Sequence, residues 1–199
     1  MKTNTLLYLL LFFSSFIYSQ EIEEVIYIKE EINSEPEEIV TYYSLKEALK
    51  TPKKVKALQI RDKGLHELPK EIKELVNLET LRVHHNRLTE IPDFIFSLTK
   101  LKELEIGANN LGILTKNIGK LTNLEYLGLK ANRLITLPKL IGKLAKLKTL
   151  NLDFNPITSL PESIKNLKKL ERFYLTGNKT PKNDIKKIKA LLPHYYRRY

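Results

Sequence analysis

Apolar residues recur along this chain with a period of 23 residues, from about residue 55 to residue 178. Each period carries the pattern LxxLxLxxNxL, and its asparagine recurs without an insertion at Asn86, Asn109, Asn132, Asn155 and Asn178. A degenerate first period has Lys63 where the asparagine would stand. A fixed period of this length predicts a solenoid, in which similar coils stack on one another.

The LxL part of each period predicts one short strand. Leu81 and Val83 would point to one side while Arg82 and His84 point to the other, because side chains alternate along a strand. The apolar sides are then buried, and successive strands pair as a parallel sheet. The asparagine follows the strand, where the turning backbone lacks partners, so its amide can satisfy adjacent turns as a ladder of asparagines.

The second half of each period predicts a short helical or 3-10 segment. A proline opens this half in four periods, where it suits the first turn, and apolar residues follow at spacings of three and four. In the remaining full period Leu114 is followed by Thr115 instead of proline, so that segment can start differently.

With these motifs the chain resembles the bacterial leucine-rich repeat family, in its 23-residue type with LPxxIxxLxxL, over about residues 45–192. The resemblance implies an α/β repeat solenoid. Its horseshoe arc would carry a parallel β-sheet of about six strands on the concave side and the short helical or 3-10 segments on the convex side. The resemblance also implies a scaffold for protein–protein contacts.

The first 19 residues are typical of a signal peptide. Lys2 supplies a positive start, and the apolar run 6–13 is too short to span a bilayer. We expect export, cleavage after Ser19 and no transmembrane span afterwards. An uncleaved anchor is the alternative.

The rest of the chain divides into four parts. Residues 20–43 form an acidic N-terminal segment, either a small β element or a linker. Residues 44–54 predict an N-terminal capping helix, because Ser44 can cap its start and Pro52 opposes its continuation. Residues 55–178 are the repeats. Residues 179–199 predict a C-terminal cap helix followed by a basic and aromatic tail, which are needed because a bare terminal coil would expose leucines to water.

Charge is unevenly distributed along the 199 residues, whose formal net charge is +11. Residues 20–50 carry nine acids against three lysines, whereas residues 51–199 carry 30 basic residues against 14 acids. The alternation of side chains places four charges of each sign on the concave face: Arg61, Arg82, Lys130, Arg172, Asp62, Glu103, Glu105 and Asp153. The basic excess therefore belongs to the convex side, the edges and the tail.

The concave face is the candidate recognition surface, because exposed tyrosine, phenylalanine and arginine are the residue types that dominate binding interfaces. Ordinary solvated strand residues are the alternative interpretation. Arg82 with Glu105, and Lys130 with Asp153, are expected to form ion pairs between neighbouring strands. The candidate partner-binding residues are Arg82, His84, Glu105, Tyr126, Lys130, Asp153, Phe154, Arg172 and Tyr174.

The sequence offers no basis for catalysis, a cofactor or a metal site. His84 and His85 lack a fixed third ligand, and no phosphate loop or nucleophile motif is present. We therefore expect a non-catalytic exported protein that binds a protein or peptide partner. The alternative function is adhesion to an anionic glycan or membrane surface through the basic convex face and the C-terminal tail. Nucleic acid is not expected as a partner of an exported protein.

Overall fold

The computed structural model describes residues 39–181 and 184–186. Packing of the backbone divides the chain into residues 1–39 and residues 40–199, and the coils belong to the second unit. The expected signal peptide at 1–19 and most of the acidic segment at 20–43 lie outside the described residues. Most of the expected C-terminal cap and tail at 179–199 also lies outside them.

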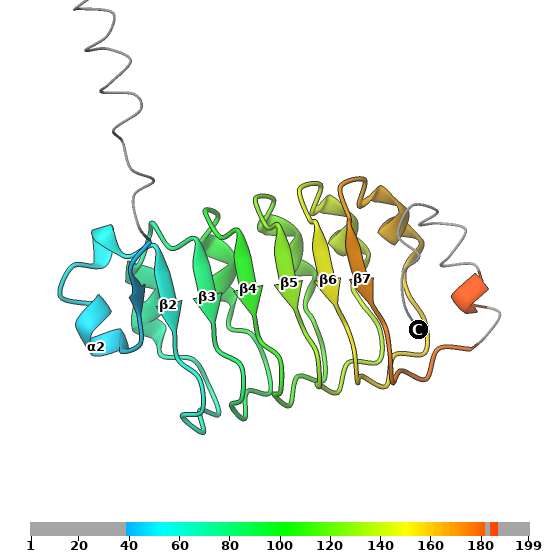
Figure 1. The fold of residues 1–199 in the computed structure, drawn as a ribbon, viewed down its shortest axis with the longest axis horizontal. Helices are drawn as coiled ribbons and strands as arrows, with labels where there is room; N and C mark the ends of the chain where they lie inside the picture. The colour runs from blue at the N-terminus through cyan, green and yellow to red at the C-terminus, as the bar shows by residue number, and fades with distance from the viewer. Residues whose placement is uncertain (1–38, 182–183, 187–199) are drawn as a thin grey trace, which may run out of the picture. The chain divides into compact units, whose positions relative to one another are not determined.

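Seven parallel strands form one sheet in which every strand neighbours the next in sequence (Figure 1). From β2 onward the paired residues are one period apart, as in Leu81 with Leu104, so each coil contributes one strand. The fold class expected from the sequence is confirmed. The strands are β1 (Thr41–Tyr42), β2 (Ala57–Gln59), β3 (Thr80–Arg82), β4 (Glu103–Glu105), β5 (Tyr126–Gly128), β6 (Thr149–Asn151) and β7 (Arg172–Tyr174).

The strand added to the expected six is β1, which pairs with β2 through Thr41 with Ala57 and Tyr42 with Leu58. Its two residues close the acidic N-terminal segment, for which a small β element and a linker were both open. Tyr42 packs against the hydrophobic core as a partly buried side chain. β1 thus covers the first edge of the repeat sheet.

Short 3-10 segments lie behind the sheet, one after each strand from β2 to β6 (Figure 1). Four of them are preceded by proline, and η4 is preceded by Thr115 at φ −70° and ψ 159°. Pro92 before η3 has φ −61° and ψ 145°, so the threonine adopts the conformation of a proline and η4 starts as the others do. The segments are η2 (Lys70–Glu74), η3 (Asp93–Ser97), η4 (Lys116–Lys120), η5 (Lys139–Lys143) and η6 (Glu162–Asn166).

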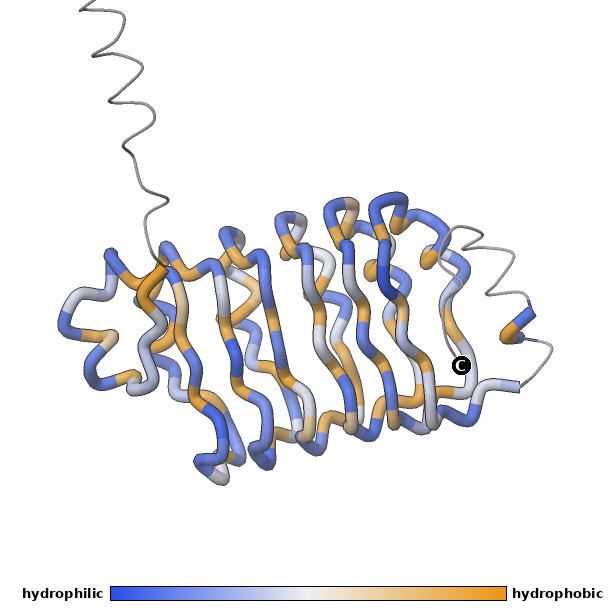
Figure 2. Tube along the Cα trace, viewed as in Figure 1, coloured by the Kyte–Doolittle hydropathy of each residue, from blue (hydrophilic) through white to orange (hydrophobic). Residues whose placement is uncertain are grey.

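The leucines of the repeat form one continuous core between the strands and the 3-10 segments. Figure 2 shows the hydrophobic positions recurring at the same places in successive coils. Leu81, Leu104 and Leu127 have no exposed surface. Because each coil has only one short strand, its leucines are covered mainly by those of the coils on either side.

Before the first coil, residues 44–54 form two short elements instead of one helix. The turn α2 (Leu45–Ala48) is followed by the 3-10 turn η1 (Pro52–Lys54). The side chain of Ser44 makes no capping hydrogen bond, although its carbonyl accepts one from the amide of Ala48 at 3.0 Å. At the other end of the chain, Asp184–Lys186 are helical.

Each repeat asparagine joins two coils through its side-chain amide. The Nδ2 of Asn132 donates to the carbonyl of Leu129 in its own coil at 3.1 Å and to that of Ile106 in the preceding coil at 3.0 Å. Its Oδ1 accepts from the backbone amide of Leu111 at 3.0 Å. Asn86, Asn109, Asn155 and Asn178 make the corresponding three bonds.

Replacing an asparagine in the middle of the ladder should lower the free energy of unfolding more than replacing one at its end. Replacing Asn132, which is 7% exposed, by alanine leaves buried backbone groups of two coils without partners. We expect a loss of about 3 kcal/mol in the free energy of unfolding. Asn178→Ala at the partly exposed end of the ladder should cost about 1 kcal/mol, because water can replace its bonds. Urea unfolding of both variants measures the two losses. Equal losses in the free energy of unfolding would contradict the view that burial makes the asparagine bonds important.

Candidate functional site

The side of the sheet that faces away from the core carries two side chains from each strand and two from the residues that follow it. We call this surface the sheet face. In each coil the residue just before the asparagine position has a positive φ, which turns its side chain to the same side as its predecessor. These residues are Asp62, His85, Ala108, Ala131 and Phe154, with φ between 51° and 56°, and Gly177 at 70°.

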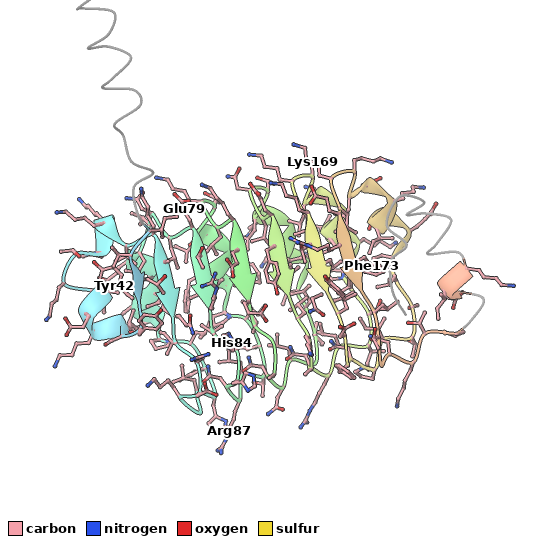
Figure 3. All side chains as sticks on the ribbon, in the orientation of Figure 1. Tyr42, Glu79, His84, Arg87, Lys169 and Phe173 are labelled. Carbon is pink, nitrogen blue, oxygen red and sulfur yellow. The ribbon has the colours of Figure 1, made fainter. Side chains whose placement is uncertain are left out.

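A hollow of about 740 Å³ lies on the sheet face over β3, β4 and β5. His84 and His85 both line it, because the positive φ of His85 cancels the usual alternation of neighbouring side chains. Figure 3 labels His84 on this face of the molecule. The complete lining is Arg82, His84, His85, Glu103, Glu105, Gly107, Ala108, Tyr126, Lys130 and Ala131.

Arg82 forms a two-pronged ion pair with Glu103. Its Nε lies 2.6 Å from Oε1 and its Nη2 lies 2.9 Å from Oε2. The hydrogen bond to Glu103 raises the pKa of Arg82, so its charge is firmly held. The expected pairing of Arg82 with Glu105 is therefore wrong. Glu105 is directly opposite Arg82 in the register, but the long arginine side chain reaches the diagonal carboxylate instead.

Glu105 is held by two uncharged donors. The hydroxyl of Tyr126 donates to Oε2 at 2.6 Å, and the backbone amide of Gly107 donates to Oε1 at 2.9 Å. Burial, with a further contribution from this hydrogen bond, raises the pKa of Tyr126. The tyrosine thus stays protonated and serves as a permanent donor to the carboxylate.

His84 sits in the hollow with its Nδ1 buried and without a hydrogen-bond partner among the described residues. Burial lowers the pKa of His84, and the nearby charge of Glu105 opposes that shift. Its ring meets the ring of His85 edge to face, with centroids 5.5 Å apart. His84 is therefore neutral at neutral pH.

Lys130 and Phe154 form a cation–aromatic pair at the side of the hollow. The Nζ of Lys130 lies 5.3 Å from the centre of the Phe154 ring. The ring rests on Gly177, where an added β-carbon would lie 2.6 Å from Cδ1 of Phe154. The expected ion pair of Lys130 with Asp153 is wrong, because the carboxylate of Asp153 instead accepts the backbone amide of Thr176 at 2.7 Å.

Phe154 is both exposed and conformationally costly. It keeps 53% of its surface accessible while its φ is 56°. A bulky residue in this region costs about 1–2 kcal/mol relative to ordinary backbone. Alanine or glycine stands at the same position in three other coils, so the scaffold does not need an aromatic ring there.

Two family models match the sequence. One, described as a leucine-rich repeat region, matches residues 108–192, and the other, described as leucine rich repeat, matches residues 76–134. The chain is a leucine-rich repeat protein. No curated protein matches the sequence significantly.

Solved structures of leucine-rich repeat proteins resemble it as well. A leucine-rich repeat protein of Leptospira interrogans is 39% identical with a TM-score of 0.68, over 70% of this chain and 36% of that protein. Another similar structure is the ectodomain of the Arabidopsis thaliana receptor kinase GASSHO1/SCHENGEN3 in complex with CASPARIAN STRIP INTEGRITY FACTOR 2. It is 34% identical with a TM-score of 0.57, and the match covers 62% of this chain and 16% of the ectodomain chain. The ectodomain of the Arabidopsis thaliana receptor kinase SOBIR1 is 27% identical with a TM-score of 0.54, and the match covers 62% of this chain and 69% of the ectodomain chain.

The chain therefore spans about a third of the length of the Leptospira protein. Leucine-rich repeat domains are typically non-catalytic scaffolds for protein interaction. Within the described ranges, no three His, Asp or Glu side chains are grouped to hold a metal ion. None of the helices in those ranges is long and apolar enough to cross a bilayer.

The leucine-rich repeat sheet gathers some of the sequence candidates and separates others. The hollow unites Arg82, His84, Glu105, Tyr126 and Lys130. The remaining four do not line it, since Asp153, Phe154, Arg172 and Tyr174 belong to the coils of β6 and β7.

Five residues that line the hollow were not among the candidates from the sequence: His85, Glu103, Gly107, Ala108 and Ala131. The 23-residue period could have identified Glu103 from the sequence, because it places this residue diagonally across from Arg82 on the next strand. His85 needed the turned backbone before the asparagine.

The back of the leucine-rich repeat coils is basic. Residues 106–124 and 126–152 contain no aspartate or glutamate. Four exposed lysines occupy equivalent positions in η4 and η5, and none makes an ion pair with another described residue. Gly119 lets the two segments pack closely, since a β-carbon there would lie 2.9 Å from the carbonyl oxygen of Leu140. We call Lys116, Lys120, Lys139 and Lys143 the lysine patch.

Protonation of His84 should weaken the fold. Because its pKa lies below the ordinary value of 6.5, the unfolded chain binds the proton more tightly. The free energy of unfolding should therefore fall as the pH drops below 6.5 and level off below the native pKa. His84→Gln should remove this part of the pH dependence. Proton NMR titration of His84 checks the cause, and its pKa should fall further in Glu105→Gln; a pKa above 6.5 would contradict the assignment.

Replacing Phe154 should cost the fold little. Phe154→Gly relieves the left-handed strain but loses the contact with Lys130 and increases the freedom of the unfolded chain. These effects are of similar size, so we expect the free energy of unfolding to change by less than about 1 kcal/mol. Leu127→Ala in the buried core should cost about 3 kcal/mol in the same urea experiment. A comparable loss in both variants would show that Phe154 is a structural residue.

Proposed function

We propose that this leucine-rich repeat protein is exported and binds a protein partner on its sheet face without catalysing a reaction. The hollow over β3, β4 and β5 is the observation that carries this proposal. It is lined by Arg82 and Tyr126, two residue types that dominate binding energy in protein interfaces. The residues that line it belong to paired strands and the turns that follow them, so binding would not have to order a flexible loop.

The aromatic residues beside the hollow support the same surface. Phe154 and Tyr174 are exposed on neighbouring coils, with 53% and 37% of their surfaces accessible. Ala108, Ala131 and Gly177 take the same left-handed backbone at the equivalent positions of other coils without an aromatic ring. The turn therefore does not require the ring of Phe154, and aromatic residues are enriched in protein interfaces. We therefore place the partner across the hollow and this aromatic pair.

The comparisons are consistent with such a role. Two of the similar structures are ectodomains, and one of them is a complex with CASPARIAN STRIP INTEGRITY FACTOR 2. An exported protein with a charge-balanced sheet face suits a protein partner, because specificity can come from shape and paired charges. The net charge of the molecule lies elsewhere.

The lysine patch favours adhesion to an anionic surface as a second candidate. Its four exposed lysines lie on the opposite side from the hollow, and residues 106–124 and 126–152 contain no aspartate or glutamate. Binding of this kind depends on the release of counterions and weakens steeply with salt. Binding at the hollow would depend much less on salt. A rise in salt concentration should therefore abolish binding at the lysine patch and leave most of the binding at the hollow.

Affinity capture with variant baits tests the proposal. A bait with Tyr126→Ala and Phe154→Gly removes two aromatic anchors of the sheet face. If each contributes as interface anchors usually do, it should bind the captured partner at least about thirtyfold more weakly than the original chain. Binding to the original chain should persist at about 0.5 M salt. Biolayer interferometry with the recovered partner gives both affinities.

The control bait replaces the lysine patch by glutamine, which removes four charges and keeps side-chain length. It should retain the partner if the sheet face is the site. Equal affinity of the aromatic variant and the original chain would overturn the proposal. Loss of binding in the glutamine variant, together with loss in salt, would assign the interaction to the back of the coils.

A further inference from the structure

Of the two acids that line the hollow, Glu103 and Glu105, only Glu105 forms no ion pair with another described residue. Among the described residues it accepts hydrogen bonds from the hydroxyl of Tyr126 and the amide of Gly107, and both donors are uncharged. The other acid of the hollow, Glu103, is paired with Arg82 through two bonds. Each oxygen of Glu105 has therefore one bond and retains a second position for another donor.

The surrounding chain makes room for this carboxylate. A β-carbon on Gly128 would overlap both oxygens of Glu105, and one on Gly107 would lie 2.7 Å from Oε1. Neither glycine has a positive φ, so the backbone itself would accept alanine at both positions. The small residues are thus explained by the space that Glu105 occupies on β4 and beside β5.

The basic groups around the hollow are committed elsewhere or uncharged. Arg82 is bound to Glu103, and Lys130 lies over the ring of Phe154. His84 interacts electrostatically with Glu105 but is neutral at neutral pH because burial lowers its pKa. Glu105 is therefore the carboxylate of the hollow that remains available for an ion pair with a group that enters it.

We propose that the hollow receives an arginine side chain of the partner, whose guanidinium binds the two free positions of Glu105 and lies against Tyr126. A planar guanidinium matches a carboxylate with two parallel bonds, and it stacks on aromatic rings. The hollow of about 740 Å³ has room for this side chain and the adjoining backbone. This inference rests on the proposed function, because it names what the sheet face recognises.

A peptide titration tests the inference without a known partner. The probe is acetyl-Gly-Arg-Gly-amide added to the full chain labelled with ¹⁵N. The signal of the Gly107 amide reports on the hollow, because this amide donates to Glu105. The peptide with citrulline in place of arginine has the same shape without the charge, and it should bind at least about tenfold more weakly.

Three variants locate the binding charge. Glu105→Gln should weaken binding of the arginine peptide at least about tenfold, as the citrulline peptide does. Glu125→Gln removes a carboxylate that is paired with Lys148 at 2.6 Å on the edge of the coils, and it should leave binding unchanged. Gly128→Ala keeps the charge of Glu105 but displaces its carboxylate, and it should weaken binding too. An unaltered spectrum away from the hollow verifies that each variant is folded.

Four results would overturn the inference. They are equal binding of the arginine and citrulline peptides, unchanged binding in Glu105→Gln, equal losses in Glu105→Gln and Glu125→Gln, or stronger binding of acetyl-Gly-Glu-Gly-amide. The last would mean that Arg82 and Lys130 make the hollow a site for anions. Failure here remains separable from failure of the proposed function. If the Tyr126→Ala and Phe154→Gly bait loses the partner but a Glu105→Gln bait keeps it, the sheet face is still the binding site. Only the inference that it receives an arginine is then refuted.

Discussion

The turn after each strand must satisfy its backbone groups inside the protein, and the neighbouring coil makes this possible. The amide of Asn109 bonds the carbonyls of Val83 and Ile106, and its oxygen accepts the amide of Leu88. One buried side chain therefore completes the turns of two coils. A coil cannot make these bonds alone, nor bury its leucines alone, so the spacing of the asparagines holds the whole stack in register.

The same turn shapes the candidate site. To bring the asparagine inward, the residue before it takes a positive φ, and its side chain then joins the sheet face. This gives the face more side chains than alternation along a strand would supply, as His84 and His85 illustrate. Where that residue is small, as at Ala108 and Ala131, the face is hollowed. Where it is Phe154, an exposed ring results.

Charge is sorted by position within the coil. On one edge, Glu79, Lys102, Glu125 and Lys148 alternate in sign from coil to coil and bond in pairs at 2.6 Å (Figure 3 labels Glu79). The back of η4 and η5 carries lysines alone, while the sheet face carries both signs. Regular alternation on the edge supports the stacking of coils, and the other two surfaces remain available for binding.

The sequence by itself determined the coil, its strand, its buried leucines and the direction in which Arg82, Glu105 and Tyr126 face, because a period of 23 residues leaves one way to bury the apolar positions. It did not determine which charged groups would meet. Arg82 reaches Glu103 and Lys130 reaches Phe154, since long side chains choose among several neighbours at similar distances once the strands are side by side. Nor could spacing show that Gly107 and Gly128 make room for Glu105, because that fit depends on atoms of two coils brought together only by the stacked sheet.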